Sequence, residues 1–119
     1  MAVTQESFQD KHNQLGPDSL QGHYLDMRLL ESHLKTNCAT VIEMSRAVLC
    51  IQTPAETAPF EDNLQNFFDS ERYFENRLAY LQSCGYKTLK LWQLVCELET
   101  RIYSYQQILT LMQHRQPAS

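Results

Sequence analysis

The residue types that carry most enzyme chemistry are present in this chain but are not grouped into motifs. No cysteine lies in a C-x-x-C pair, and no H-E-x-x-H or E-x-x-H pattern occurs, so no zinc site of known spacing can be read. Glu31 and His33 are two residues apart and would point away from each other on a helix. The three glycines are too few for a phosphate-binding loop. We therefore expect no metal, no cofactor and no enzyme activity.

The histidines and cysteines also lack the neighbours that nucleophilic catalysis requires. A nucleophile needs a base within hydrogen-bond reach and a third group that orients the base. His33 and Cys38 are five residues apart, which puts them on different faces of a helix. The simplest interpretation is that all four cysteines are reduced and mostly buried. Two disulfides in a secreted domain are the alternative, for which an even number of cysteines is weak support.

The composition is that of a small globular protein. Hydrophobic residues make up 43% of the chain and charged residues 20%, which is too apolar for a disordered protein. The formal net charge is −4, from 10 basic and 14 acidic residues. A protein that binds duplex DNA needs a basic surface that displaces the counterions of the phosphates, so no nucleic-acid partner is expected.

The sequence shows no signal for targeting or for membrane insertion. The first residues have neither the basic stretch nor the apolar core of a signal peptide. The longest apolar run, at residues 47–51, is far shorter than the roughly 20 apolar residues that span a bilayer. We therefore expect an intracellular protein, cytoplasmic or nuclear, with no membrane partner.

Heptad-like spacing of apolar residues predicts three long helices, over about residues 18–52, 60–84 and 88–114. In the first, an apolar residue recurs every seven positions, and in the third the apolar positions alternate by four and three without a break. The predicted stripe positions are Leu20, Met27, Leu30, Leu34, Val41, Met44, Val48, Ile51, Phe60, Leu64, Phe67, Phe74, Leu78, Leu81, Leu91, Val95, Leu98, Ile102, Tyr105, Leu109 and Met112.

The segments between these helices carry signals for tight connections. Thr53 and Glu56 have the spacing of a capping box, which predicts one helical turn inside the connector at residues 53–59. Gly85 is placed to end the second helix in a left-handed conformation, and Thr88 to cap the third. The short second connection predicts an antiparallel helical hairpin.

These elements together predict an all-α protein, an antiparallel three-helix bundle with coiled-coil-like seams. The bundle is expected at residues 17–116. A flexible or short-helical arm at residues 1–16 precedes it, and a tail at residues 117–119 follows it.

The first helix is predicted to be longer than the hairpin that packs against it. Counting from the two connectors, residues 18–27 extend beyond the hairpin tip by about 15 Å, at ~1.5 Å per residue. An exposed apolar stretch usually marks an interface, so we expect a second chain to cover it, with the N-terminal arm as the alternative. The partner-binding residues predicted there are Leu20, Tyr24, Leu25 and Met27.

The second helix is rich in aromatic and acidic residues. Phe68, Tyr73 and Tyr80 fall outside its apolar stripe. One interpretation is a helix wedged between two neighbours, with an acidic edge in solvent. The other is a partner-binding surface that accepts a basic amphipathic helix, with these three aromatic residues as binding residues.

Two polar residues stand within the apolar stripes. Asn37 and Glu71 are expected about one helical turn apart across the first and second helices. Either both reach water at the edge of the seam, or they form a buried polar contact that sets the register of the helices.

All three helices carry more apolar residues than one central seam can bury, which favours a protein-interaction function. We expect a non-enzymatic subunit, scaffold or adaptor in a homodimer or hetero-oligomer, bound to a helix of its own copy or of another protein. One alternative is a small acidic chaperone or inhibitor that captures a single target protein. Another is a secreted four-helix ligand with disulfides, in which the arm supplies the first helix.

Overall fold

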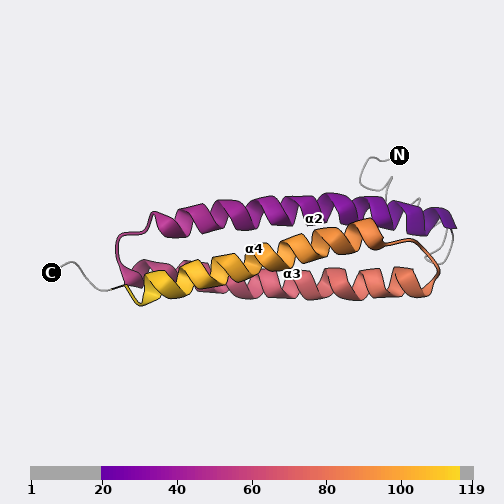
Figure 1. Cartoon of the computed structure of the whole chain (residues 1–119). Coiled ribbons are helices and arrows are strands. Elements are labelled where there is room, and N and C mark those ends of the chain that lie inside the picture. Colours follow the sequence, from indigo (N-terminus) through magenta and orange to yellow (C-terminus); the bar gives the residue numbers. More distant parts are fainter. Residues whose placement is uncertain (1–19, 116–119) are drawn as a thin grey trace.

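The structure, a computed structural model, describes residues 20–115, and their side chains from residue 25 onward. Its elements are α2 (Leu20–Leu49), η1 (Pro54–Thr57), α3 (Ala58–Ser83) and α4 (Leu89–Gln113). Figure 1 shows the long helices side by side, with α3 running opposite to α2 and α4. No strand occurs within the described range. The predicted all-α antiparallel three-helix bundle is confirmed, while the predicted arm (1–16) and tail (117–119) lie outside the described residues.

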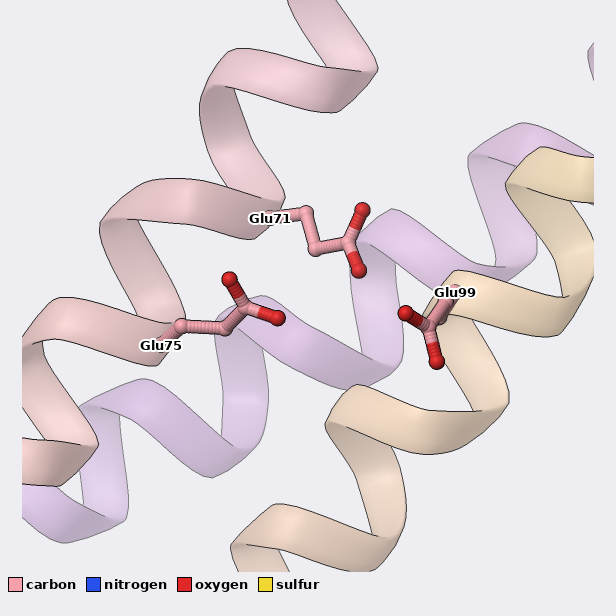
Figure 2. A group of neighbouring side chains, drawn as sticks. All are labelled: Glu71, Glu75 and Glu99. Carbon is pink, nitrogen blue, oxygen red and sulfur yellow. The ribbon is translucent and has the colours of Figure 1, made fainter.

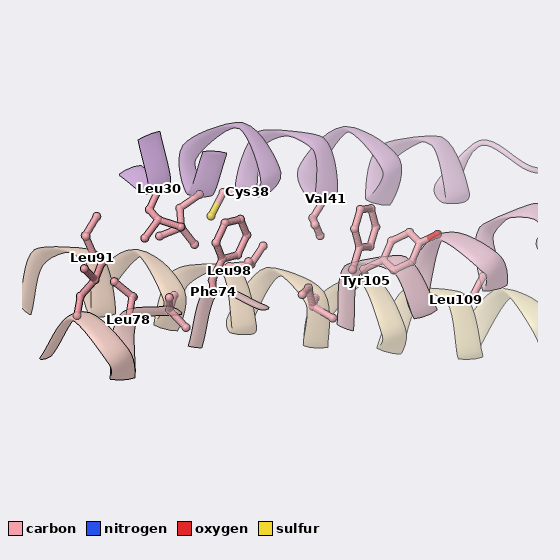
Figure 3. Packing of buried hydrophobic residues seen from close by; sticks show 14 of the residues in the cluster. Leu30, Cys38, Val41, Phe74, Leu78, Leu91, Leu98, Tyr105 and Leu109 are labelled. Atoms are coloured by element: carbon pink, nitrogen blue, oxygen red, sulfur yellow. The ribbon is translucent and has the colours of Figure 1, made fainter. Parts of the chain in front are cut away.

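The predicted apolar stripes meet in one central seam, part of which is seen in Figure 3. The largest side chains that solvent does not reach are Leu34, Val41, Val48, Leu78, Leu81, Leu98, Ile102 and Tyr105. On each helix these residues are three, four or seven positions apart, which puts them on one face. Burying a side chain of this size contributes about 1.5–3 kcal/mol, so the stripes hold the three helices together.

The stripe of α2 departs from the prediction at one place. Cys38, rather than Asn37, takes the buried position that follows Leu34, and it is 5% exposed. Its thiol lies 4.0 Å from the carbonyl oxygen of Leu94 on α4. Burial raises the pKa of this thiol above the ordinary value of 9.0. The other three cysteines are exposed, so the expectation of mostly buried thiols is wrong, although all four are free.

The first connector contains the single helical turn that its sequence predicts. The Glu56 carboxylate accepts hydrogen bonds from the backbone N–H of Thr53 at 2.7 Å and of Gln52 at 3.0 Å, at the start of η1. The Thr53 hydroxyl also donates to this carboxylate, at 3.0 Å. These hydrogen bonds lower the pKa of Glu56 below 4.5, with those from Thr53 contributing most.

The second connector reverses the chain at the predicted glycine. Gly85 has a φ of +95°, a conformation that costs energy for any residue with a Cβ atom. The N–H of Gly85 bonds the carbonyl of Gln82, and that of Tyr86 bonds the carbonyl of Leu81, which together make a Schellman cap. Thr88 is the residue that caps α4, as predicted, but its side chain is buried and makes no capping hydrogen bond.

The central helix of the three is α4, which packs along α2 and α3, whereas α2 and α3 meet less extensively. Asp26 of α2 pairs with Arg77 of α3, which lies seven residues before Cys84 at the hairpin end. Met27 packs against the core. Residues 26 and 27 therefore lie alongside the hairpin, and the predicted overhang is wrong for these two residues. Residues 18 and 19 lie outside the described range. The offset between α2 and α3 depends on how residues 50–57 are folded, which helix lengths do not reveal.

Candidate functional site

The helix α3 has one side toward α2 and another toward α4, and the predicted aromatic binding residues divide between them. Arg77 marks the α2 side, because it pairs with Asp26. Glu75 marks the α4 side, because its carboxylate lies within 4.8 Å of that of Glu99. By their positions around the helix, Tyr73 and Tyr80 fall near Arg77. Phe68 falls near Glu75.

Two tyrosines and a leucine form an exposed apolar surface along α2 and α3, which we call the aromatic surface: Leu29, Tyr73 and Tyr80. Tyr73 is 58% exposed, and the other two are each 38% exposed. The pair between Asp26 and Arg77 aligns the two antiparallel helices at this point. One turn further along, Leu29 on α2 and Tyr73 on α3 lie on the same side as that pair. The three apolar side chains therefore belong to one face of the bundle.

Arg77 organises the aromatic surface. Its guanidinium lies 5.0 Å from the centroid of the Tyr80 ring, a cation–π distance, while it pairs with Asp26. The ring of Tyr73 lies edge-on to that of Phe74 in the core, with 5.7 Å between centroids. Both tyrosine rings are thus held in place before a partner binds, which lowers the conformational entropy that binding would cost.

The binding residues predicted on α2 do not all belong to the aromatic surface. Met27 packs against the core and lines a groove at the start of α4. Leu25 is half-buried. The side chains of Leu20 and Tyr24 lie outside those that the structure describes. The α2 residue that does face this side is Leu29, which was not predicted as a binding residue, because it follows the expected overhang of residues 18–27.

On the α4 side of α3, three glutamates converge to form what we call the carboxylate cluster: Glu71, Glu75 and Glu99. One oxygen of each lies within 4.8 Å of an oxygen of each of the others. Figure 2 shows the three side chains turned toward one another between α3 and α4. Glu71 and Glu75 are four residues apart on one face of α3, and α4 supplies the third carboxylate.

Glu71 is the buried member of the carboxylate cluster. It is 8% exposed, and no hydrogen-bond donor or cation in residues 25–115 pairs with its carboxylate. Burial raises the pKa of this carboxyl above 4.5, and the charges of Glu75 and Glu99 raise it further. A buried carboxylate without a partner destabilises the fold unless a proton or another cation neutralises it.

The predicted contact between Asn37 and Glu71 does not form. The Asn37 side chain donates a hydrogen bond of 2.9 Å to the carbonyl oxygen of His33, one turn earlier on α2. Asn37 is eleven residues after Asp26, about three full turns, and so lies on the side of α2 that faces α3. Glu71 lies on the opposite side of α3, toward α4, so the two residues point into different grooves. The prediction of a register-setting contact between them is wrong.

A groove at the hairpin end of the bundle contains charged groups that pair with one another. It is lined by Met27, Arg28, Glu31, Lys87, Lys90 and Leu91. Glu31 pairs with Lys35 at 3.0 Å and with Lys90 at 3.1 Å, and hydrogen bonds from these lysines lower its pKa. A neighbouring hollow holds Trp92, whose indole N–H donates to the Gln82 side chain at 3.1 Å. Neither lining contains a histidine or a cysteine for nucleophilic catalysis.

Glu99 was not predicted as a site residue, although the sequence contains a signal for it. If residue 84 is level with residue 88 across the hairpin, residues 71–75 of one helix are level with residues 97–101 of the other. Glu99 is at the middle of that second range. Short motifs on a single helix miss such a group, because its members come from two helices and the hairpin brings them together.

Within the described part of the chain, no helix combines the length and the apolar character that crossing a bilayer requires. No protein-family model, no curated protein and no solved structure matches this chain. The surfaces described above are therefore the basis for a functional conclusion.

Proposed function

We propose that this protein is a non-enzymatic helical protein–protein interaction module, a subunit or adaptor of a homo- or hetero-oligomeric assembly, whose aromatic surface binds a helix of another chain. The observation that supports this most is the 58% exposure of Tyr73, together with the exposure of Tyr80 and Leu29, on the side of the bundle where Asp26 pairs with Arg77. Tyrosine is a frequent anchor of interfaces, because a rigid ring buries a large apolar area while its hydroxyl keeps a hydrogen bond.

The spacing of the aromatic surface suits a helical partner. Tyr73 and Tyr80 are seven residues apart on α3, about 10 Å along the helix axis. Side chains at this spacing meet positions about two turns, or one heptad, apart on a second helix, as in a coiled-coil seam. A second copy of this chain offers the same spacing, so a symmetric homodimer is one form of the proposed assembly.

The proposal includes an intracellular location. The four cysteines are free, and three of them are exposed. Exposed unpaired thiols persist in reducing compartments, whereas secreted domains of this size tend to pair theirs.

Light scattering across a concentration series tests the proposal. We expect the measured mass to rise above that of the 13.9 kDa monomer at high concentration. Replacing both tyrosines, by Tyr73→Ser and Tyr80→Ser, is expected to weaken association by about tenfold or more, since truncating an interface anchor costs about 2 kcal/mol. Tyr103→Ser is the matched control, because Tyr103 is 62% exposed on α4, outside the aromatic surface.

A wild-type chain that stays monomeric at every concentration excludes the homo-oligomer. The hetero-oligomer is then tested with a photo-reactive amino acid at position 73 or, as the control, at position 103. The proposal requires a defined cross-linked product in the native source from position 73 alone. Equal products from both positions, or none from either, contradict it.

A further inference from the structure

We infer that the carboxylate cluster, Glu71, Glu75 and Glu99, binds a hard divalent cation of the calcium class that joins α3 to α4. This inference goes beyond the proposed function, because the cluster lies on the α4 side of α3 and the aromatic surface lies on the α2 side.

The spacing of the carboxylate oxygens fits one ion. Ca²⁺ binds oxygens at about 2.3–2.6 Å, so two oxygens on the same ion are at most about 5 Å apart. The three glutamate oxygens are all within 4.8 Å of one another. Mg²⁺ requires near-ideal octahedral geometry and loses its water ligands reluctantly, so it is usually bound through one or two carboxylates. A set of three protein carboxylates therefore favours the larger ion.

The burial of Glu71 is the second observation that points to a cation. Its carboxylate is directed into the space shared with Glu75 and Glu99 (Figure 2), yet the residue is 8% exposed and has no donor or cation partner within the described chain. A group of surface acids relieves its repulsion by spreading into solvent. A carboxylate enclosed between two helices has little freedom to move away, so a bound cation would remove both the cost of burial and the repulsion.

The nearby arginines do not supply this charge. Arg72 follows Glu71 in the sequence but is exposed, one position further around the helix. Arg101, on α4, pairs with Glu97 at 3.9 Å. An oxygen-only ligand set without sulfur or imidazole is the type that hard cations prefer, which argues against zinc or copper. Because Glu99 is exposed, water can complete the coordination shell from the solvent side.

An ion at this position would be bound by both arms of the α3–α4 hairpin. Two ligands come from α3 and one from α4, so the site exists only when the hairpin is folded. A ligand that binds the folded state and not the unfolded state stabilises the fold in proportion to the logarithm of its concentration. The inferred role is therefore a calcium-dependent clamp between two helices of the bundle.

Thermal unfolding at neutral pH, followed by circular dichroism, tests the site. We expect millimolar CaCl₂ to raise the Tm by about 5 °C relative to NaCl of the same ionic strength, with a smaller rise in MgCl₂. Glu71→Gln and Glu99→Gln are expected to lose this rise. Glu43→Gln, which removes an exposed carboxylate of α2, is the matched control and keeps it.

A direct binding measurement uses Tb³⁺ in place of Ca²⁺. Trp92 is the single tryptophan and lies seven residues before Glu99 on α4, about 10 Å along the axis, so its excitation sensitises a lanthanide bound in the cluster. Luminescence should appear in the wild type, decrease as Ca²⁺ displaces Tb³⁺, and be lost in Glu71→Gln. That variant removes a repulsive charge and should fold without any ion, so a lost signal reports the site and not the fold.

Three results would overturn the inference. One is the same wild-type Tm in CaCl₂, MgCl₂ and NaCl. Another is an equal rise in the wild type and in Glu71→Gln, which would mean that the ion acts elsewhere on this acidic chain. A larger rise with MgCl₂ than with CaCl₂ would overturn the assignment to the calcium class.

Discussion

The buried hydroxyl of Tyr105 on α4 donates a hydrogen bond of 2.7 Å to the backbone carbonyl oxygen of Phe60, in the first turn of α3. The Tyr105 ring is fully buried and packs edge-on against Phe67, with 5.4 Å between ring centroids. Burial raises the pKa of the phenol to about 12, so it remains a neutral donor throughout the physiological range. One side chain therefore joins the second half of α4 to α3 through both packing and a hydrogen bond.

Removing this hydroxyl should weaken the bundle without disturbing its packing. We expect Tyr105→Phe to lower the free energy of unfolding by about 1 kcal/mol, because the ring stays in place and one buried hydrogen bond is lost. Urea denaturation measures the change. Tyr103→Phe is the control, since Tyr103 is exposed on the same helix and its substitution should leave the midpoint unchanged. Equal midpoints for Tyr105→Phe and the wild type would show that the hydroxyl contributes nothing to stability.

The raised pKa of Glu71 predicts a loss of stability as the pH rises. The unfolded chain binds this proton less tightly than the folded chain, so the contribution of Glu71 to stability is complete below pH 4.5 and disappears as the pH rises through its folded pKa. Glu31 and Glu56, whose pKa values are lowered, act in the opposite sense, and their contribution is lost below pH 4.5. In the absence of divalent cations, we therefore expect the wild type to be more stable in mild acid than at neutral pH.

The variant Glu71→Gln separates this effect from other titrations. It should raise the free energy of unfolding at neutral pH by on the order of 1 kcal/mol, because the amide carries no charge and can donate to a neighbouring carboxylate. It should also flatten the pH dependence above pH 4.5, measured by urea denaturation in buffers that contain a chelator. Glu43→Gln should leave the dependence unchanged. A Glu71→Gln protein that is less stable than the wild type at neutral pH would contradict this interpretation.

The four thiols are expected to divide into three that react and one that does not. Cys50, Cys84 and Cys96 are exposed, whereas Cys38 is buried and its pKa is raised by burial. Because the thiolate is the reactive form, Cys38 should react with a disulfide reagent only when the protein unfolds. A thiol titration of the native protein, repeated in denaturant, should thus count about three and then four groups.

The substitution Cys38→Ala provides the control for this titration. It should leave the native count unchanged and reduce the denatured count by one. Fewer than four thiols in the denatured wild type, without a reductant, would reveal a disulfide. That result would favour the secreted four-helix ligand over the interaction module.

Local sequence patterns were sufficient to predict the architecture. The apolar spacing predicted which face of each helix is buried, because an α-helix repeats every 3.6 residues whatever its neighbours are. The turn at Thr53 to Glu56 and the left-handed Gly85 follow from side-chain and backbone preferences over three or four residues. Leu34, Leu98 and Ile102 were therefore predicted in the core and are found there.

The candidate sites were predicted only in part, because they depend on which groove each helix side faces. Tyr73 and Tyr80 were expected to be exposed, but their grouping with Leu29 follows from the alignment of α2 with α3 at Asp26 and Arg77. The same alignment removed the expected overhang at residues 26 and 27 and separated Asn37 from Glu71.

The sequence by itself thus determined the helices, their buried faces and the hairpin turn, since these depend on residues a few positions apart. The tertiary structure alone decided that Cys38 replaces Asn37 in the core and that Glu71 lies with Glu75 and Glu99. Both outcomes depend on the offset and order of three packed helices. That arrangement depends on the packing of all the side chains together and on the path of residues 50–57. The apolar repeat along a single helix carries no information about either.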